Sequence, residues 1–508
     1  MTWSHSLIGL LLAVGFSAGF ACNSPYGTTT DATGDDTDSS CPVGSAGCAC
    51  TGGGSCDAGL VCAASRCVDS GQATTSMAET TADVTTDGET TEGPDCNPNG
   101  GGSVDVACPT EQPYCVAGEC VDCNGLSCDA VSPTLPFCDP GTGLCAACLC
   151  NDASPVCDPV AHTCSKCDAH SDCPDSACDL ETGACLPAAN TLWVGGGSCD
   201  DDGTGAKTDP LCGLDEAFAR VKSGAAASVA VRVKAGDYAV ASPLHVPAGR
   251  IVGLVPASDG LEIKIGSSMA PTVMVEANAR FLLDGVEIDQ SSGSGIECVD
   301  ATMWLDRLRV GKAAQYGVAS EGCMVTMRRS VLVGNTIAGA QIVAGQLRVE
   351  NSFISSNGGF DYPGGGVYLG GGAKLDAVYT TFVENLAAAG SPFSVACADD
   401  AAKESVKLRN SIAINKGANT LCEGASVATT AWTALVPGNT NIAVDYNSLG
   451  LYLSKDPDIV GVYRAIPETM LDALAKWQAG DPLVDFDGDA RPSDADATDF
   501  AGADRVAR

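Results

Sequence analysis

Residues 325–335 read VTMRRSVLVGN, and residues 347–357 repeat the pattern as LRVENSFISSN. In both stretches apolar and polar side chains alternate, which predicts a β-strand with one buried face rather than a helix. One such strand cannot bury its own apolar face, but copies stacked on one another can. The two stretches therefore predict neighbouring coils of a β-solenoid.

The same pattern returns about six times between residues 281 and 416. Its apolar anchors are separated by 22, 22, 22, 26 and 33 residues, and a period in the low twenties is typical of repeat architectures. The anchors are Leu283, Leu305, Met327, Val349, Leu375 and Leu408. Glycine also recurs, at Gly295, Gly317, Gly339 and Gly366, where we expect tight corners that need a permissive backbone. The predicted fold class is all-β.

The repeated phrase, with its Asn-Ser step and closing Asn, resembles right-handed parallel β-helix proteins of the pectin-lyase-like superfamily. The flanks agree, because LWVGGGSCDDDG from Leu192 and VAVRVKAGDY from Val229 are similar to the usual start of such a domain. DFDGDARPSD from Asp485 resembles its usual end. The resemblance covers roughly residues 190–508 and implies a parallel β-helix there. It implies no single activity, because the superfamily contains lyases, hydrolases, esterases and proteins without known chemistry.

Two short helices are expected at the open ends of the solenoid. Residues 215–222 and residues 468–478 both have helical spacing of apolar side chains. An uncovered end would expose unpaired backbone groups to association with other chains. We therefore expect each helix to cap one end.

Charge and cysteine content indicate export. The formal net charge of −36 argues against a nucleic-acid partner, since phosphate contacts need clustered Lys and Arg. The chain has 29 cysteines, which suit an oxidising compartment. Both features favour an exported protein.

The N-terminus predicts how the chain leaves the cell. Leu7 to Phe20 is an apolar stretch of signal-peptide length, and the following Cys22 resembles the acylated cysteine of a bacterial lipoprotein. Residues 1–21 would then be a signal peptide, and the protein would reach the outer membrane or cell surface through its lipid alone. Setting Cys22 aside leaves even numbers of cysteines in every cluster. The alternative is an ordinary secretory signal and an extracellular protein.

Four segments precede the solenoid. Residues 22–40 and the acidic, Thr-rich residues 69–95 have almost nothing to bury and are expected to be disordered linkers. Residues 41–68 form a small Cys-rich module, and residues 96–187 form a Cys-rich repeat region in which CDPGTGLCAAC returns as CDPVAHTCSKC. Disulfides are favoured over zinc, because CxxC units alternate with solitary cysteines in an exported chain.

Three disulfides are predicted within the solenoid domain. Cys199 and Cys212 are close enough in sequence to staple its first loop. Two further pairs are each 25 residues apart, which is close to one coil, and would bridge neighbouring coils. These pairs are Cys298 with Cys323 and Cys397 with Cys422.

Aligning the repeats predicts a column of charged side chains. It contains Asp284, Asp306, Arg328, Glu350, Asp376 and Arg409, and the following positions are Gly285, Arg307, Arg329, Asn351, Ala377 and Asn410. Because parallel strands lie about 4.8 Å apart, opposite charges on adjacent coils would pair on the solvent face. The simpler interpretation is a surface charge ladder, worth a few tenths of a kcal/mol per pair.

The alternative is a sugar-binding or lyase groove on the same column. Arg307, Arg309, Arg328 or Arg329 would then bind a uronate carboxylate. Asp284, Asp306 or Glu350 would serve as a base or calcium ligand. Pectin-lyase-like hydrolases usually carry a denser aspartate group with a His and an Arg-x-Lys signature, which this solenoid lacks.

Binding and structural side chains are also predicted. Phe360, Tyr362 and Tyr368 belong to a Gly-rich loop, and aromatic faces stack on sugars, so we predict a glycan-binding site there; the competing interpretation is a loop that packs on the coil. Asparagines that end successive strands are expected to satisfy corner backbone groups. They are Asn335, Asn357 and Asn385.

The closing motif also resembles part of a calcium site. Asp485, Asp487 and Asp489 alternate in DFDGD, as in part of a calcium loop, but the closing Glu of an EF-hand is missing. No cofactor is required by the sequence.

These observations favour an exported, lipid-anchored surface protein that presents a β-helix for binding glycans or cell-surface partners. The alternatives are a polysaccharide lyase or glycosidase on the same solenoid, and a structural stalk or adhesin without a small ligand.

Overall fold

The computed structural model describes residues 60–63, 66–69, 114–116, 119–121, 128, 134–139, 144–258, 262–268, 270–389, 391, 393–403, 405–414, 421–422, 426–427, 450–469, 471, 474–494 and 497–504. The chain divides into two compact units, Met1–Thr91 and Glu92–Arg508. The predicted signal peptide, Cys22 and the two linkers lie outside the described residues. Within the part that is described, no helix is long and apolar enough to cross a membrane.

In the first unit, β1 (Leu60–Ala63) pairs antiparallel with β2 (Arg66–Asp69), which places Cys62 opposite Cys67. In the second unit the Cys-rich repeats form short antiparallel hairpins. Their strands are β3 (Tyr114–Val116) with β4 (Glu119–Val121), β5 (Phe137–Asp139) with β6 (Leu144–Ala146), β7 (Val156–Asp158) with β8 (Thr163–Ser165), and β9 (Cys178–Asp179) with β10 (Ala184–Cys185).

Each of the last two repeats is closed by two disulfides from upstream cysteines to its hairpin. Cys148 and Cys150 bond to Cys157 and Cys164 on β7 and β8. Cys167 and Cys173 bond in the same order to Cys178 and Cys185 on β9 and β10. Disulfides therefore replace the core that such small units cannot build.

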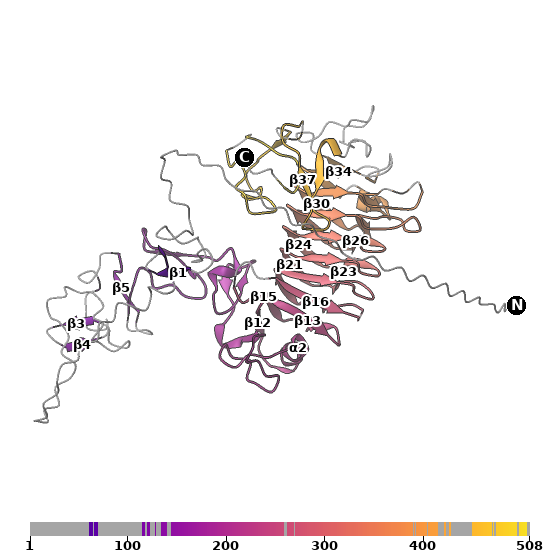
Figure 1. Ribbon diagram of the computed structural model, residues 1–508. Helices are drawn as coiled ribbons and strands as arrows, with labels where there is room; N and C mark the ends of the chain where they lie inside the picture. The colour runs from indigo at the N-terminus through magenta and orange to yellow at the C-terminus, as the bar shows by residue number, and fades with distance from the viewer. Residues whose placement is uncertain are drawn as a thin grey trace, which may run out of the picture. The chain divides into compact units, whose positions relative to one another are not determined.

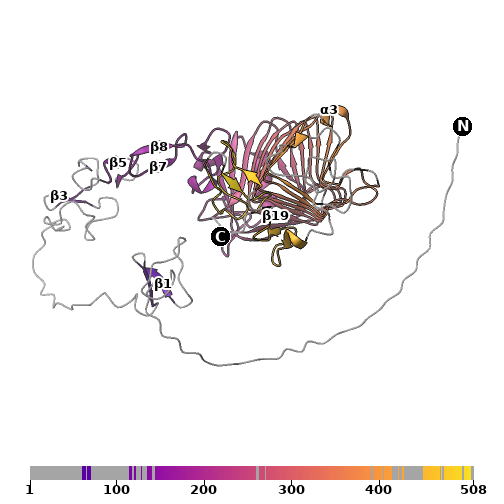
Figure 2. The same cartoon turned by 90° about the horizontal axis from the view of Figure 1, so that it is seen from above.

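The rest of the second unit is a parallel β-helix, as predicted, with three sheets around one core (Figures 1 and 2). Figure 1 shows the strands stacked from β12, next to α2, to β34. The ten-stranded sheet contains β11 (Thr191–Val194), β12 (Ser228–Val233), β15 (Ile251–Pro256), β18 (Arg280–Asp284), β21 (Thr302–Asp306), β24 (Met324–Arg328), β27 (Gln346–Glu350), β30 (Lys374–Val378), β33 (Val406–Arg409) and β35 (Ser426–Val427).

The other two sheets repeat the same stacking order. The eight-stranded sheet contains β13 (Gly236–Val240), β16 (Ile263–Ser267), β19 (Val286–Asp289), β22 (Arg309–Gly311), β25 (Val331–Val333), β28 (Phe353–Ser355), β31 (Thr381–Val383) and β34 (Ile412–Ile414). The seven-stranded sheet contains β14 (Leu244–Val246), β17 (Val273–Val275), β20 (Ile296–Val299), β23 (Tyr316–Glu321), β26 (Ala338–Val343), β29 (Val367–Gly370) and β32 (Val395–Cys397).

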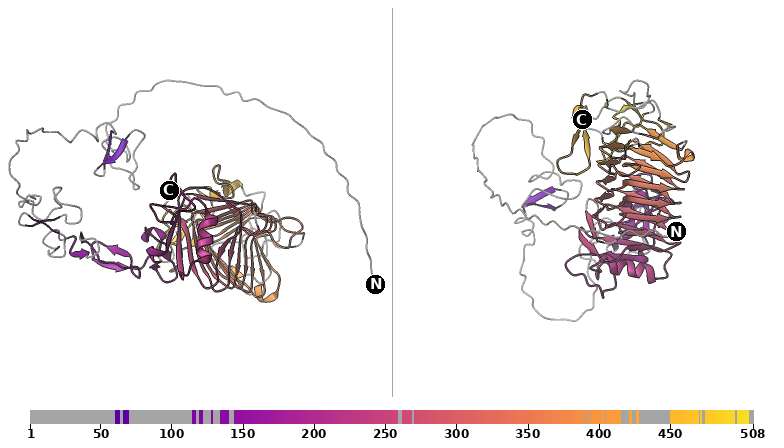
Figure 3. Two further views of the ribbon diagram at one scale, coloured as in Figure 1. Left: turned by 90° about the horizontal axis from the view of Figure 1, so that it is seen from below. Right: turned by 90° about the vertical axis from the view of Figure 1, so that its right-hand side faces the viewer.

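Capping differs between the two ends. Helix α2 (Leu214–Ser223) forms where the sequence predicts it, against the end of the stack (Figure 3). It buries Leu214, Phe218 and Val221 against the core. The helix predicted at residues 468–478 is wrong, because β38 (Ala475–Lys476) lies there and pairs with β39 (Thr498–Asp499). Other helical segments among the described residues are short, and they include α3 (Asp400–Lys403) and the 3-10 turns η2 (His170–Asp172) and η3 (Ala188–Asn190).

The C-terminal segment packs along the outside of the eight-stranded sheet. Its hairpin, β36 (Leu453–Lys455) and β37 (Tyr463–Ala465), projects beside the stack (Figure 3). Phe353 points outward from β28 and meets Phe486 edge to face, with ring centroids 5.0 Å apart. Outward apolar residues on β25, β28 and β34 are therefore buried by this segment rather than exposed.

The register corrects the sequence alignment at one repeat. The structure pairs Leu347 with Leu375 and Glu350 with Val378, so the repeat at residue 373 is shifted by two positions from the predicted alignment. Asp376 consequently lies beside Arg348, outside the predicted charged column. The corner position of that coil is Tyr379, with φ of 50°, instead of Ala377.

The recurring glycines are needed for a different reason from the one predicted. Neither Gly317 nor Gly339 adopts a left-handed backbone; instead, a Cβ on Gly317 would lie 2.6 Å from the carbonyl oxygen of Gly339. A Cβ on Gly339 would lie 2.8 Å from the carbonyl oxygen of Gly366 in the next coil. The column therefore reflects close approach of neighbouring coils.

Candidate functional site

The charged column lies on the outer face of the ten-stranded sheet. Strand pairing places Asp284 beside Asp306, Arg328 beyond it and Glu350 beyond that. In two of these coils the residue after the charged position is an arginine. These are Arg307, with φ of 47°, and Arg329, with φ of 43°. These left-handed corners turn the chain into the eight-stranded sheet and direct both arginines back toward the aspartates.

The aspartates of the column are held by arginines from the following coil. Arg307 Nε donates to Asp284 Oδ1 at 2.8 Å, and its Nη2 donates to the other oxygen. Arg329 binds both oxygens of Asp306 in the same way, with Nε 2.9 Å from Oδ1. Arg328 Nη2 also donates to Asp306 at 3.1 Å. Each carboxylate is thus engaged through both of its oxygens.

Electrostatics keep Asp306 ionised. Burial by itself would raise the pKa of the Asp306 carboxyl, but the hydrogen bond from Arg329 and the charge of Arg328 outweigh it and hold the pKa below its usual value. The same pairing raises the pKa of Arg329 although burial opposes it. Asp306 and Arg329 therefore form a fixed ion pair, and Asp306 is not a base that exchanges protons near neutral pH.

The last Cys-rich repeat covers part of this face, which the sequence did not predict. Its Ala177 and Leu186 pack with Val255 and Leu282 on the outside of the ten-stranded sheet. As a result Asp284 and Asp306 are only 4% and 5% exposed. The expected solvent-exposed charge ladder is therefore wrong for these two residues.

The predicted Arg328–Glu350 pair is replaced by another. Glu350 accepts a hydrogen bond from Arg348, two residues earlier on the same strand. The guanidinium of Arg328 instead lies 5.8 Å from the ring centroid of Trp304. Arg309, on the neighbouring sheet, pairs with Glu287. The candidate aspartates are thus engaged by candidate arginines, and Glu350 by Arg348. This arrangement describes a structural charge network better than an acid–base pair.

The seven-stranded sheet brings tyrosines together on its outer side. Gln341 Nε2 donates to the hydroxyl of Tyr316 at 3.0 Å, and Tyr368 lies beside Gln341 in the next coil. Burial raises the pKa of Tyr316, and the nearby phenols of Tyr368 and Tyr362 add to the rise. All three tyrosines remain partly exposed. We call Tyr316, Gln341, Tyr362, Tyr368 and Phe360 the tyrosine patch.

The loop that carries Phe360 and Tyr362 is held at its base. The N–H of Gly358 donates to Asn335 O at 2.8 Å, and the Tyr362 carbonyl accepts the N–H of Ala388 at 2.7 Å. Phe360 is 72% exposed at the loop surface. Sequence analysis missed Tyr316 and Gln341 because both fall between the aligned phrases. The glycine that recurs near the start of each of these strands could have located them.

The predicted asparagines form a buried ladder. Asn357 donates through Nδ2 to Leu332 O at 2.8 Å and to Asn385 Oδ1 at 3.1 Å, while its Oδ1 accepts the N–H of Asn335 at 3.0 Å. All three asparagines are at most 1% exposed. They satisfy corner backbone groups and offer no ligand site.

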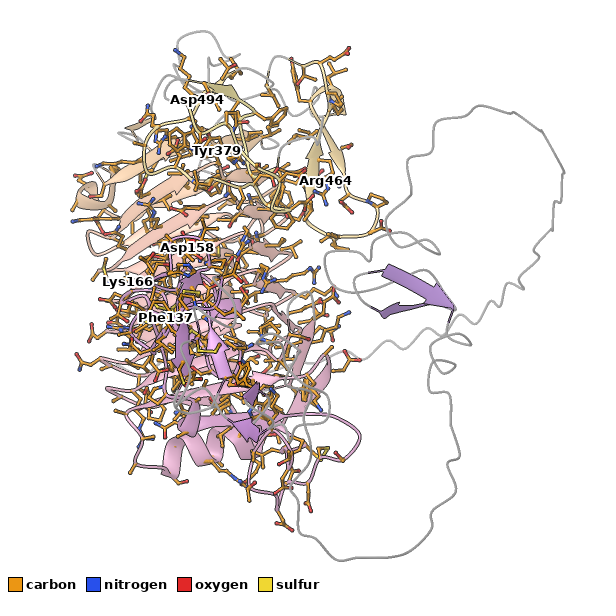
Figure 4. All side chains as sticks on the ribbon, turned by 90° about the vertical axis from the view of Figure 1, so that its left-hand side faces the viewer. Phe137, Asp158, Lys166, Tyr379, Arg464 and Asp494 are labelled. Atoms are coloured by element: carbon orange, nitrogen blue, oxygen red, sulfur yellow. A yellow bond between two sulfur atoms is a disulfide. The ribbon has the colours of Figure 1, made fainter. Side chains whose placement is uncertain are left out.

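The acidic closing motif is engaged with its own backbone and with one arginine. Asp485 Oδ1 accepts N–H groups from Asp487 and Asp489 at 3.1 and 2.9 Å. Asp487 also pairs with Arg464, which Figure 4 labels. Burial raises the pKa of the neighbouring Asp504 to about 7, although Arg464 opposes the rise. Calcium binding by this motif stays a prediction.

The described cysteines from Cys128 onward are engaged in disulfides. The structure joins Cys199 to Cys212, Cys298 to Cys323 and Cys397 to Cys422, the three pairs expected from spacing. Two groups of three cysteines lie close enough together to hold a metal ion. Every cysteine in both groups is bonded to another cysteine, so these thiols are not available as ligands.

Comparison with known proteins identifies similar folds and one family model. The model described as "Family of unknown function (DUF8331)" matches residues 83–191, largely the Cys-rich repeat region. No curated protein sequence matches the chain. Among solved structures, Jun a 1, the major allergen from cedar pollen, is 11% identical with a TM-score of 0.28, covering 51% of this chain and 86% of that one.

Two lyase structures are similar at the same level. Pectate lyase Pel9A is 10% identical, covers 62% of this chain and 96% of its own, and gives a TM-score of 0.27. A rhamnogalacturonan lyase is 9% identical, covers 60% and 95%, and gives a TM-score of 0.30. At such identities the similarity concerns the fold alone.

Proposed function

We propose that this protein is exported, is held at the cell surface by a lipid on Cys22, and binds glycans through the tyrosine patch without cleaving them. The apolar stretch Leu7–Phe20 and the isolated Cys22 support export and lipidation. The disulfides between residues 128 and 422 support an oxidising compartment.

The observation that carries glycan binding is the convergence of three tyrosines on one outer face. Tyr316, Tyr362 and Tyr368 come from a strand, a loop and a second strand. Planar rings present apolar faces to the C–H side of a sugar, and phenol and amide groups hydrogen-bond its hydroxyls. Gln341 supplies the amide beside Tyr368.

The absence of cleavage is supported by the charged column. Both Asp284 and Asp306 are bound by arginine through two oxygens and are largely covered by the last Cys-rich repeat. A general base needs a carboxylate or amine within reach of the substrate proton and a pKa near the working pH. Asp284 and Asp306 are too deeply buried to reach a substrate proton, and the pKa of Asp306 is held below its usual value.

Affinity electrophoresis of the mature chain through polysaccharide gels tests this proposal. We expect retarded migration in at least one polysaccharide, and loss of most of the retardation in Tyr368→Ala and Tyr362→Ala. Leu451→Ala is the matched control, because Leu451 is also exposed, at 66%, but lies in the C-terminal segment. Ultraviolet-absorbing unsaturated ends would instead establish a lyase, and no interaction with any polysaccharide would favour a structural stalk.

Lipidation is tested separately. Cells expressing the full chain are labelled with radioactive palmitate, and the label should appear in the wild type and be absent from Cys22→Ser. Label that persists in the variant, or is absent from the wild type, would contradict the proposed anchor.

A further inference from the structure

The outer face of the seven-stranded sheet extends well beyond the tyrosine patch. One outward residue per coil continues the line of Tyr368 toward the N-terminal end of the stack. Strand pairing connects Ala396, Tyr368, Gln341, Ala319, Glu297, Met274 and His245 in that order, and His245 at the end of the row pairs with Glu276. Neighbouring members are one strand spacing apart, about 4.8 Å, so the row runs parallel to the axis of the β-helix. Figure 1 labels two of its strands, β23 and β26.

The row presents only a small side chain at the point where a bound polymer would extend beyond the tyrosines. Ala319 is the residue next to Gln341, and only a methyl group stands at this position. The opposite side is bounded by the fixed loop with Phe360 and Tyr362, described above. A linear polymer can therefore stack on Tyr368 and continue over Ala319 along the axis, whereas the loop obstructs a path across the sheet at that point.

The charge of the row determines which polymer fits. Its members include Glu297 and no lysine or arginine. Glu321 ends the strand that carries Ala319, and Asp361 lies next to Phe360; both are exposed. The whole chain has a net charge of −36, so its field opposes the approach of a polyanion. This negative charge should therefore repel uronate or sulfated polymers, whereas it does not oppose the binding of uncharged polymers.

We propose that the tyrosine patch binds a neutral polysaccharide that lies along the β-helix axis, and that Glu297 excludes polyanionic polymers. This inference rests on the proposed glycan-binding function and specifies its ligand class. The stacking contribution comes from Tyr368 and Tyr362, and the neutral row over Ala319 extends the contact by further sugar units. Of the arginines predicted to bind uronates, those beside the ten-stranded sheet pair with Asp284 or Asp306. The remaining one, Arg309 on the eight-stranded sheet, pairs with Glu287.

A matched pair of polymers tests the ligand class. Hydroxyethylcellulose and carboxymethylcellulose share one backbone and differ in charge, and xylan and polygalacturonate widen the comparison. We expect neutral members to retard the mature protein at least tenfold more strongly than anionic members at low salt. Because Debye screening shortens the repulsion, raising the salt concentration should narrow the difference.

Two variants test the assigned residues. Glu297→Gln should increase retention by the anionic polymers several-fold and leave neutral binding unchanged, with Glu262→Gln as the control because its side chain is 79% exposed and outside the row. Ala319→Trp should abolish extended neutral binding by blocking the row. If Ala319→Trp binds the neutral polymers as strongly as the wild type does, the proposed axial path is wrong.

The outcomes separate this inference from the proposed function. Retention by neutral but not anionic polymers supports both. Stronger retention by polygalacturonate, weakened by salt, would overturn the ligand class while leaving glycan binding intact. No retention by any of the four polymers would overturn the ligand class together with the glycan-binding function.

Discussion

The guanidinium of Arg232, on the outer face of β12, donates through Nη2 to the carbonyl oxygen of His170 at 3.0 Å. Three further donations reach Ser176 O at 2.5 Å, Pro256 O at 2.7 Å and the carbonyl oxygen of Cys173. Arg232 is 4% exposed, so one buried cation joins the last Cys-rich repeat to the second and third strands of the ten-stranded sheet. This repeat and the β-helix share an interface rather than a flexible link.

Replacing Arg232 should loosen this interface. In Arg232→Met the buried carbonyl oxygens lose a charged donor, and we expect the free energy of unfolding to fall by about 3 kcal/mol. Urea unfolding followed by circular dichroism measures the change, and limited proteolysis should show new cleavage around residues 187–190. Lys207→Met is the control, because its pair with Asp175 is more than half exposed on both sides. Equal urea midpoints for the two variants would contradict a stabilising role for Arg232.

The same interface predicts a dependence of stability on pH. Burial lowers the pKa of His170; Asp284 and Asp306 oppose this, and Arg232 and Arg328 reinforce it. The unfolded state therefore takes up the proton first as pH falls, so stability is lost below about pH 6.5. The urea midpoint should drop between pH 7.5 and 5.5 in the wild type and drop less in His170→Gln.

A matched histidine variant separates this effect from general acid sensitivity. His162→Asn lies in the preceding repeat, at φ of 55°, a conformation that Asn tolerates. It should keep the wild-type pH dependence. If His170→Gln and the wild type lose the same stability over this range, the buried histidine is not the sensor.

The sequence predicted the β-helix because its signal is local and repeated. Inward positions such as Leu283, Leu305 and Met327 are apolar in every coil, and alternation makes one register correct. Alternation also explains the error at residue 373. A shift by two positions keeps every side chain on its face, so Leu375 fits beside Val349 as well as beside Leu347. The corner residue would have distinguished the two registers. That residue, Tyr379, is not the Gly or Asn that is typical of a left-handed corner.

Two segments cover outer faces of the β-helix, namely the last Cys-rich repeat and the C-terminal segment. Neither contact could be predicted in the same way. Val255 and Leu282 point outward, yet in a nearly continuous apolar strand they do not differ from inward residues. Phe353 and Val333 likewise gain their burial from a segment more than 100 residues later in the chain. Such contacts depend on long-range pairing, which a single sequence does not contain. Of the tyrosine patch, the sequence identified Phe360 and Tyr362 on the loop and Tyr368, which the structure places on β29 rather than on the loop. It missed Tyr316 and Gln341.

Two glycines on strands of the β-helix should respond oppositely to an added methyl group. Gly339→Ala would place its Cβ 2.8 Å from Gly366 O and 2.9 Å from Ile354 Cγ2, so neighbouring coils must separate. We expect a loss of about 2–4 kcal/mol in the free energy of unfolding. Gly266→Ala meets no atom within 4 Å and needs no left-handed backbone, so stability should stay the same or rise by up to about 1 kcal/mol. Urea unfolding of both variants measures the contrast, and a destabilised Gly266→Ala would contradict the close-approach explanation.

The pairing of Arg329 with Asp306 separates a structural charge network from a catalytic one. Arg329→Met leaves Asp306, 5% exposed, with Arg328 as its remaining side-chain donor, and we expect a loss on the order of 3 kcal/mol at pH 7. Because the pKa of Asp306 is held below its usual value, the stabilisation is present above about pH 4 and declines as the pH falls further. The difference in urea midpoint between wild type and variant should therefore shrink in acid. Lys264→Met, whose pair with Glu262 is solvent-exposed, should change the midpoint little. Glycan retention by Arg329→Met should equal that of the wild type under conditions where both are folded; loss of binding or of a cleavage activity at unchanged stability would instead place the substrate on the ten-stranded sheet.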